Sequence, residues 1–243
     1  MEEEHLLTGH TKAVLALVVD EPSGRLYSSS TDATVRAWDM ADMACVAVIR
    51  GHSKPVTQLQ LLGGRLLFTA AGGAVRVWDT QSFVCLAKIR TSFYSGAIRS
   101  MLVSNGSDAH VTGDGTIYVG HQDTTVKKYL PINAAAAAEA AGAAGVPFSP
   151  RASGPGVPGS VRAPDAQTNP SSGHVGPVND LVACGSYICS AGGDTTVRVW
   201  RASDLQLVRV LRGHRGSVLC LLAVGNMLLS GSRDNTIRWV RLR

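Results

Sequence analysis

Two short stretches decide the fold of this chain: GHTKAV at residues 9–14 and DATVRAWD at residues 32–39. An apolar segment with a Pro-Ser-Gly turn separates them, and the same order of residues returns along the 243-residue chain. His10 and His52 are 42 residues apart. A repeat of this length indicates a unit that packs against copies of itself, because one such unit cannot bury its own apolar faces.

Five passes through this repeat can be recognised. Four of them begin with a Gly-His pair, at Gly9-His10, Gly51-His52, Gly173-His174 and Gly213-His214. The third pass lacks the pair but retains DTTVK at residues 123–127 and Tyr129. Each pass predicts four strands separated by turn residues. In the first pass the predicted strands are Val14–Val19, Arg25–Ser28, Thr34–Trp38 and Cys45–Ile49.

The Gly-His pair, the Asp-x-Thr-Val-Arg string, the Trp-Asp end and the repeat length together resemble the WD40 (Trp-Asp repeat) family. The resemblance implies an all-β WD40 β-propeller with five recognisable blades, as a closed five-blade ring, an open arc or a partial propeller. The N-terminal HLLTGH (residues 5–10) is similar to VIRGH and VLRGH before the second and fifth blades. An N-terminal strand is therefore expected to complete the last blade and close the ring.

A low-complexity segment interrupts the repeats. Residues 134–172 are rich in Ala, Pro, Gly and Ser, a composition that has little to bury. We therefore expect blades one to three with the N-terminal closing strand in residues 1–130, a disordered insertion in residues 131–172, and blades four and five in residues 173–243. We expect the insertion to displace the outer strand of blade three.

The resemblance also implies a buried hydrogen-bonded chain of His, Ser or Thr, Asp and Trp in each blade. Its members here are His10, Ser28, Asp32 and Trp38 in blade one, His52, Thr69 and Trp78 in blade two, His174, Ser190, Asp194 and Trp200 in blade four, and His214, Ser230 and Asp234 in blade five. Blade two lacks the Asp and is expected to be softer. Trp239 of blade five comes one residue early, so strand alternation predicts that it points to the opposite sheet face.

Repeated Ser, His and Asp residues suggest catalysis, but a triad enzyme needs one activated nucleophile beside an oxyanion site. Several copies around a propeller indicate an architectural role, and we expect no catalytic residue. The histidines show no metal-ligand spacing with Cys or carboxylates, so no metal site is expected. The string GPGVPG at residues 154–159 matches a dinucleotide-binding pattern, but its prolines exclude the helix that pattern needs. No cofactor is expected.

Composition narrows the cellular context. The net charge is +5 without blocks of Lys or Arg, so nucleic acid is not the expected partner. Five cysteines without a CxxC spacing indicate a reducing compartment. The start MEEEHLL lacks a signal pattern, and no apolar run approaches the ~20 residues of a spanning helix. We expect a cytoplasmic protein, with the nucleus as the alternative, and no membrane partner.

Two sets of polar residues recur at fixed places in the repeat. Arg36, Arg76, Lys127, Arg198 and Arg238 recur on the third strand, where we expect a solvated or hairpin-facing stripe. The candidate partner-binding face comprises the loop residues Lys12, Lys54, Tyr94, Gln122, Arg215 and Arg233. Such a face would be basic and would favour acidic or phosphorylated peptides. The sequence leaves the oligomeric state open.

The leading functional hypothesis is a non-catalytic WD40 scaffold or adaptor that mediates protein–protein interactions in a multiprotein complex. Ubiquitin ligation, signalling and trafficking are uses that the resemblance implies. One alternative is the WD40 portion of a larger enzyme subunit, such as a glutathione-degrading peptidase subunit. Another is an RNA- or chromatin-associated binding module. The fold alone does not choose among them, because function lies in sites carried on folds.

Overall fold

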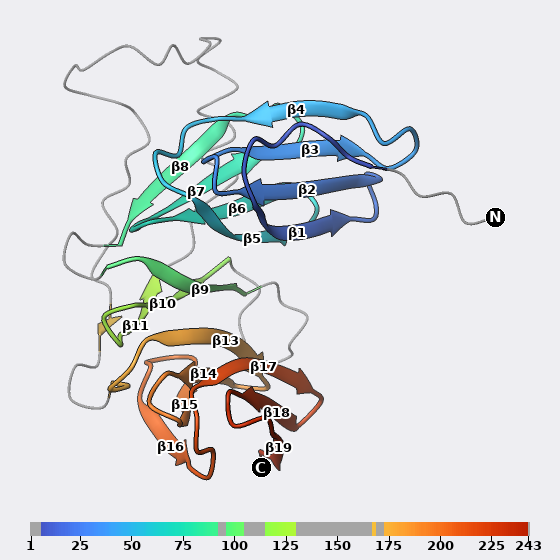
Figure 1. Cartoon of the computed structure of the whole chain (residues 1–243). Helices are drawn as coiled ribbons and strands as arrows, with labels where there is room; N and C mark the ends of the chain where they lie inside the picture. The colour runs from blue at the N-terminus through green and yellow to red at the C-terminus, as the bar shows by residue number, and fades with distance from the viewer. Residues whose placement is uncertain (1–5, 92–95, 105–114, 130–166, 169–172, 243) are drawn as a thin grey trace.

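A computed structural model describes residues 6–91, 96–104, 115–129, 167–168 and 173–242. All regular elements in these ranges are strands, arranged in five antiparallel sheets along the chain (Figure 1). The first sheet contains β1 (Val14–Asp20), β2 (Arg25–Ser30), β3 (Val35–Asp39) and β4 (Cys45–Ile49). The second contains β5 (Val56–Leu62), β6 (Leu66–Ala71), β7 (Ala74–Asp79) and β8 (Cys85–Arg90). No helix in the described ranges has the length and apolar character to cross a bilayer.

The later sheets follow the same order with two variations. The third contains β9 (Ile98–Val103), β10 (Ile117–His121), β11 (Val126–Tyr129) and β12 (Gln167–Thr168). The fourth contains β13 (Val178–Cys184), β14 (Tyr187–Gly192), β15 (Val197–Arg201) and β16 (Leu207–Leu211). The fifth contains β17 (Val218–Val224), β18 (Met227–Ser232) and β19 (Ile237–Arg241). The predicted all-β fold and the four strands predicted for the first pass are confirmed.

The Asp-x-Thr string forms the tight turn between the second and third strands of a sheet. Asp32 Oδ1 accepts hydrogen bonds from the Thr34 amide at 2.9 Å and the Thr34 hydroxyl at 2.6 Å. The residue between them, Ala33, has φ 66°, in the left-handed region. Asp favours such turns because its side chain can bond the backbone two residues on. The repeated string therefore sets the register of the hairpin.

The core lies between sheets rather than within one. Tyr27 and Val35 of the first sheet pack on Leu59, Leu67 and Trp78 of the second, and all five are buried. Three further clusters join the second sheet to the third, the third to the fourth and the fourth to the fifth. Each sheet thus has an incoming face, which packs on the preceding sheet in the second to fifth sheets, and an outgoing face, which packs on the following sheet in the first to fourth. Such sheets depend on their neighbours for stability.

Polar side chains strengthen the same junctions. Gln60 of β5 donates to the Met101 carbonyl at 2.8 Å and accepts from the Val103 amide at 2.6 Å. Gln58 donates to the Arg99 carbonyl at 3.1 Å. Between the fourth and fifth sheets, Asp180 accepts from the Leu221 amide at 2.8 Å. These bonds satisfy backbone groups at the free edge of the next sheet's first strand.

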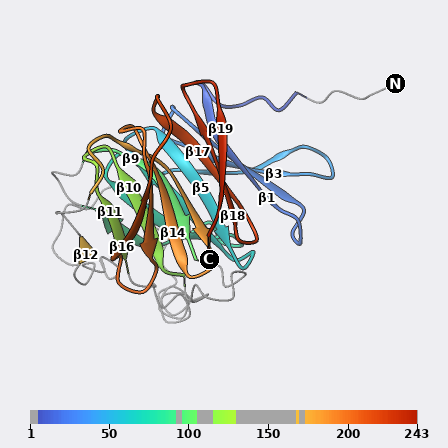
Figure 2. The ribbon, with the colours of Figure 1, turned by 90° about the horizontal axis from the view of Figure 1, so that it is seen from below.

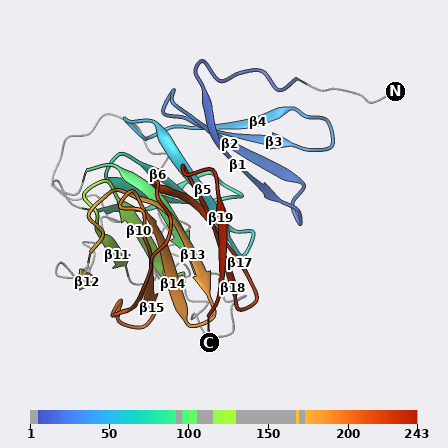
Figure 3. The ribbon, with the colours of Figure 1, turned by 60° about the horizontal axis from the view of Figure 1, so that its bottom comes forward.

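The five sheets form an open arc. β1 packs on β5, β5 on β9, β9 on β13 and β13 on β17, but no comparable contact joins β17 back to β1. Figure 1 shows the first sheet at one end of this series and the fifth at the other, and Figure 3 shows the first sheet from another side. Among the three predicted arrangements, the structure is therefore an open or partial propeller.

The predicted closure by an N-terminal strand is not formed. Residues 6–10 belong to no strand, and the fifth sheet consists of β17, β18 and β19. The reason is geometric, because the first and fifth sheets stand at opposite ends of the arc. Seen from below, the fifth sheet has no described strand in front of it (Figure 2).

The predicted insertion lies outside the described residues except at its C-terminal end. There, Gln167 and Thr168 form β12 and pair with Lys128 and Lys127 of β11. The expectation that the segment displaces the outer strand is thus wrong at these two positions, since the segment itself supplies a short outer strand. Backbone pairing makes few demands on side chains, which is why composition did not reveal it.

The register of the last strand confirms the prediction for Trp239. Trp239 pairs with Leu229, just as Val199 pairs with Cys189 in the fourth sheet. Val240 therefore occupies the position that Trp200 holds in the fourth sheet. Trp239 lies on the outgoing face, and its side chain is 68% exposed.

Replacing Gln60 by Ala tests the polar links between sheets. We expect Gln60→Ala to lower the free energy of unfolding by about 1–3 kcal/mol, because it orphans the Val103 amide and the Met101 carbonyl. Gln58→Ala is the matched control, since it removes one exposed bond and should cost less than about 1 kcal/mol. Urea denaturation of both variants measures the difference. Equal losses would contradict the role given to Gln60.

Candidate functional site

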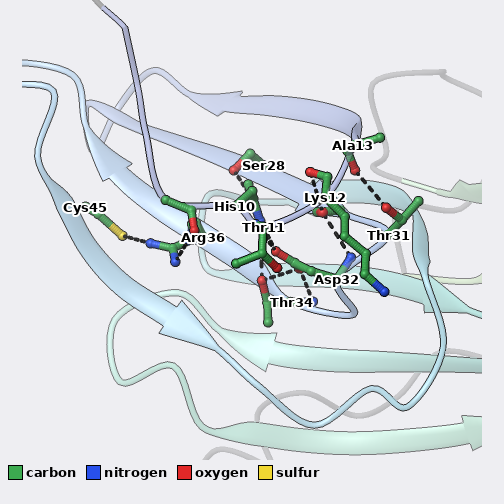
Figure 4. A network of polar contacts seen from close by, with 12 residues as sticks. His10, Thr11, Lys12, Ala13, Ser28, Thr31, Asp32, Thr34, Arg36 and Cys45 are labelled. Atoms are coloured by element: carbon green, nitrogen blue, oxygen red, sulfur yellow. Dashed lines mark hydrogen bonds and ion pairs between the residues drawn. The ribbon is translucent and has the colours of Figure 1, made fainter.

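Polar side chains link the strands inside the first sheet (Figure 4). His10 Nδ1 lies 2.9 Å from Asp32 Oδ2, and His10 Nε2 lies 2.8 Å from Ser28 Oγ. Trp38 Nε1 donates to the same Ser28 oxygen at 2.8 Å. Asp32 also accepts from the Thr11 amide at 3.1 Å. The network therefore fastens the Gly-His loop, which precedes β1, onto β2, β3 and the turn between them.

The chemistry of these groups fixes the direction of the hydrogen bonds at the two ends of the network. Trp38 can only donate and the ionised Asp32 can only accept. Ser28 therefore receives the indole proton, and His10 donates from Nδ1 to Asp32. With a neutral imidazole, Ser28 donates its own proton to His10 Nε2, and every group of the network makes its bonds. Such fully satisfied buried networks hold a unique structure.

The same network recurs with local changes. In the fourth sheet, His174 bonds Asp194 at 2.9 Å and Ser190 at 2.7 Å, and Trp200 donates to Ser190 at 2.8 Å. In the fifth, His214 lies 2.9 Å from both Asp234 and Ser230, while Val240 stands at the Trp position.

The second sheet has the shortest network. His52 lies 2.6 Å from Thr69, and Trp78 donates to Thr69 at 2.9 Å. No Asp completes the chain, because Gly72 and Gly73 form the turn after Ala71. The Thr69 hydroxyl still connects His52 to Trp78, so the missing Asp shortens the network without dividing it.

The presence or absence of the Asp controls the local electrostatics. Burial opposes ionisation of Asp194, but hydrogen bonds from Val175 and Thr196 outweigh it, so the pKa falls to about 2. Asp32 and Asp234 have pKa values lowered in the same direction, mainly by the hydrogen bond from Thr34 and Thr236, respectively, against the cost of burial. Without a carboxylate, burial lowers the pKa of His52 to about 3, with Arg76 and Lys88 adding to the effect.

Arg36 and Arg76 do not extend into the solvent as a solvated stripe would, whereas Arg238 is exposed. Arg36 Nη2 donates to the Gly9 carbonyl at 2.7 Å, and Arg76 does so to Gly51 at 2.8 Å. Each guanidinium also lies over the Trp of its own sheet, 5.8 Å from the ring centroid. Gly51 has φ 149°, and a Cβ there would lie 3.1 Å from Trp78. Gly9 and Gly213 share the positive φ and the close approach of an Arg side chain, so three of the four Gly-His pairs use the freedom of Gly here.

The third sheet replaces these contacts with different residues. Lys127 and Tyr129 both donate to the Thr91 carbonyl, at 3.3 Å and 3.2 Å. His121 of β10 is fully buried and occupies the register position of Gly192, where a Cβ would point at His174. Burial, followed by the charge of Lys127, lowers the pKa of His121 to about 4. Sequence analysis missed His121, although its place after a predicted strand in the repeat lacking Gly-His was a usable signal.

The Ser-His-Asp geometry does not present a nucleophile to substrate. Ser28 is 4% exposed and Ser190 is fully buried, and in each case the hydroxyl oxygen already accepts the indole N–H. A substrate carbonyl would need that oxygen accessible, next to free donors for an oxyanion. Across the described ranges, no group of three or more His, Cys, Asp or Glu side chains could hold a metal ion.

The candidate partner-binding residues lie at one end of the sheets, where the Gly-His loops meet the turns between second and third strands. The four basic residues and Gln122 are exposed, and Tyr94 lies outside the described residues. Lys54 packs over the turn at Gly72, and Gln122 packs over Gly96. Arg215 and Arg233 flank the fifth-sheet turn, where their backbone amides bond Asp234 and the Ser217 carbonyl. We call Lys12, Lys54, Gln122, Arg215 and Arg233 the loop face.

The second sheet leaves its cation on the loop face without a carboxylate beside it. In the first, fourth and fifth repeats, an Asp carboxylate of low pKa stands at the turn. The second sheet has Gly72 and Gly73 there, next to Lys54. Within the described residues, no ion pair engages the side chains of Lys12, Lys54, Arg215 or Arg233. These cations are therefore available to an anionic ligand.

Removing the central hydroxyl of a network tests its structural role. We expect Ser28→Ala to lower the free energy of unfolding by about 2–4 kcal/mol, because it leaves both Trp38 Nε1 and His10 Nε2 without partners at about 1–3 kcal/mol each. Ser53→Ala, at an exposed position of the second Gly-His loop, should change it by less than about 0.5 kcal/mol. Thermal and urea denaturation compare the two. If Ser28→Ala left the free energy of unfolding unchanged, the network would not contribute to stability as we expect.

The low pKa values of the half-buried His52 and the fully buried His121 predict that stability depends on pH. His52 and His121 are neutral in the folded protein down to pH values near 3 and 4, but an unfolded His takes up a proton near pH 6.5. The unfolded state therefore binds more protons between about pH 4 and 6.5, so stability falls as the pH drops through this window. Each histidine adds a slope of up to about 1.4 kcal/mol per pH unit. His52→Gln should flatten the measured slope, and an unchanged slope would contradict this assignment.

Three curated proteins share short stretches with this chain. Pre-mRNA-processing factor 19 of Bos taurus is 42% identical over 55 residues, which are 23% of this chain and 11% of that protein. The probable E3 ubiquitin ligase complex SCF subunit sconB of Aspergillus oryzae is 44% identical over 54 residues, 22% of this chain and 8% of that protein. Mitochondrial division protein 1 of Sclerotinia sclerotiorum is 40% identical over 55 residues, 23% and 8%. The matches span only about a tenth of these relatives.

A family comparison covers much more of the chain. The WD40 family, described as WD domain, G-beta repeat, matches residues 1–39, 43–79, 167–201 and 205–239. These ranges make up more than half of the sequence and correspond to the first, second, fourth and fifth repeats. The unmatched stretch contains the third repeat, which lacks Gly-His. With its repeated sheets and His-Ser-Asp-Trp networks, the chain belongs to the WD40 repeat family.

Proposed function

We propose that this protein is a non-catalytic scaffold or adaptor that holds other proteins together through its loop face. The observation that carries the proposal is the pairing of rigid networks with exposed cations at one end of the sheets. In each complete repeat the His and Asp that build the network also fix the Gly-His loop by backbone bonds, such as Arg215 N to Asp234 at 2.8 Å. Binding residues on rigidly held loops lose little conformational freedom on association.

The charges of the loop face favour an acidic or phosphorylated peptide segment. Lys12, Lys54, Arg215 and Arg233 are exposed, and the Asp carboxylates at the same end already accept several hydrogen bonds each. Lys54 stands beside a turn without a carboxylate, so we place the strongest contact to an anion there. Charge-assisted bonds to carboxylate or phosphate are stronger than neutral ones.

The names of the relatives support the general role of a complex component. One relative is named as a subunit of an SCF ubiquitin ligase complex and another as a pre-mRNA-processing factor. Because their matched stretches are short, we do not transfer either pathway. We propose the cytoplasm as the location, with the nucleus as the alternative.

Charge reversal tests the loop face directly. We expect an acidic or phosphorylated peptide library to yield binders whose affinity falls about 10-fold or more for Lys54→Glu combined with Arg215→Glu, because attraction becomes repulsion. Arg209→Glu, on the exposed outer strand β16, is the matched control for net charge. Isothermal titration at two salt concentrations measures the effect. Equal binding by all three proteins would remove the loop face from the proposal.

A further inference from the structure

The two ends of the arc expose the apolar faces that every internal junction buries. The first residue of the inner strand shows this most clearly: Val56, Ile98, Val178 and Val218 are 0–1% exposed, whereas Val14 is 50% exposed. Leu17, on the same incoming face of the first sheet, is 63% exposed, while its counterpart Leu59 is buried. The first sheet therefore lacks a neighbour of the kind that the other four possess.

The outgoing face of the fifth sheet is open in the same way. Ile237 is 75% exposed, although its counterparts Val35, Val75 and Val197 are 3% exposed or less. Trp239, Leu222 and Val224 extend this apolar face. A contiguous apolar face that is exposed on a folded protein marks an interface, and Trp is among the residue types most often found at the energetic centre of one.

The fifth sheet also lacks an outer strand. β19 is its edge strand, whereas β4, β8 and β16 cover the corresponding strand in three other sheets. After β4 and β16, the outer strand runs directly into the Gly-His loop of the next sheet. The chain before Gly9 has the same form, since Leu6-Leu7-Thr8-Gly9-His10 matches Val210-Leu211-Arg212-Gly213-His214. Leu6 is 85% exposed, so this strand-like sequence has no sheet to cover.

Register and charge fit the two unfilled elements to each other. In the fourth sheet, Val197 pairs with Leu211 and Arg198 with Val210. The same register would place Leu7 opposite Ile237 and would carry the acidic residues Glu2–Glu4 toward Arg241. β19 contributes Arg238 and Arg241, both exposed. Opposite charges across paired strands favour this alignment.

We propose that a second copy of this chain completes the fifth sheet. The residues before Gly9 of one copy add to β19 of the other as its outer strand, and the incoming face of the first sheet covers Ile237 and Trp239. The contact continues the junctions already present within the chain. It joins different surfaces of the two copies, so it is a head-to-tail contact that leaves one open face at each end and can extend to further copies. This inference does not rest on the proposed function of the loop face.

Two substitutions that block opposite faces test the proposal in the full-length protein. Trp239→Glu blocks the outgoing face of the fifth sheet, and Leu17→Glu blocks the incoming face of the first. Both side chains are exposed, so the fold should survive, as circular dichroism and the thermal midpoint will show. We expect the wild-type mass in sedimentation velocity to rise with concentration. Each variant alone should stay monomeric, with self-association weakened ~30-fold or more, as for loss of an anchor residue.

The decisive measurement is the mixture of the two variants. Trp239→Glu retains a free first-sheet face and Leu17→Glu retains a free fifth-sheet face, so the mixture should form a dimer and nothing larger. Val175→Glu, in a loop away from both faces and 85% exposed, should associate like the wild type. Ile237→Glu and Val14→Glu repeat the pair independently.

Three results would overturn the proposal. A wild type that stays monomeric at every concentration would show that the faces remain open or close within one chain. Variants that associate like the wild type would show that another surface is used. A mixture that stays monomeric, although both variants fold, would show that the contact is not head-to-tail.

Discussion

The hydrogen-bonded chain from Trp through Ser and His to Asp is the constraint on which the rest of this structure depends. It runs in one direction because its first member can only donate and its last can only accept. The chain joins four segments that are otherwise held by strand pairing alone: the Gly-His loop, the second strand, the turn and the third strand. In the first sheet it does so with bonds of 2.8–2.9 Å between His10, Ser28, Asp32 and Trp38. A fixed Gly-His loop in turn fixes where the preceding outer strand must end.

This constraint explains how individual repeats differ where a residue of the network is missing. The second sheet loses its Asp and keeps a neutral, half-buried His52 that bonds only Thr69 in the network. The third sheet lacks the leading Gly-His pair. His121, which lies on β10, is the buried histidine of this sheet. In the fifth sheet, Val240 stands at the position that Trp holds in the other networks, and Trp239 lies on the outgoing face. The second and fifth sheets each lack one member of the network, and the remaining members keep their hydrogen bonds.

Much of the fold could be predicted from the sequence, because strand periodicity and turn chemistry are local. Alternation alone gave the opposite face for Trp239, and the spacing in the second repeat revealed its missing Asp. The openness of the arc could not be predicted in this way. It depends on the angle at which whole sheets pack. Many small contacts determine this angle together, and no single residue sets it. Backbone pairing of Gln167 and Thr168 was hidden for a related reason, since an edge pair needs no particular side chain.

The candidate site likewise contains features that the sequence predicts and features that it does not. The networks were predictable because each uses a fixed set of residue types at fixed spacing. The Arg36 contact to the Gly9 carbonyl could not be predicted, because the sequence does not show whether a long side chain on a strand extends into the solvent or bonds the backbone. The loop face and the ends of the arc are thus governed by different forces. Hydrogen bonds hold the loops rigid within each sheet, whereas apolar burial binds sheet to sheet and stops where the series of sheets stops. A ligand on the loop face and a neighbour at the arc's ends can therefore act on this protein independently, since neither uses the contacts that stabilise the other's site.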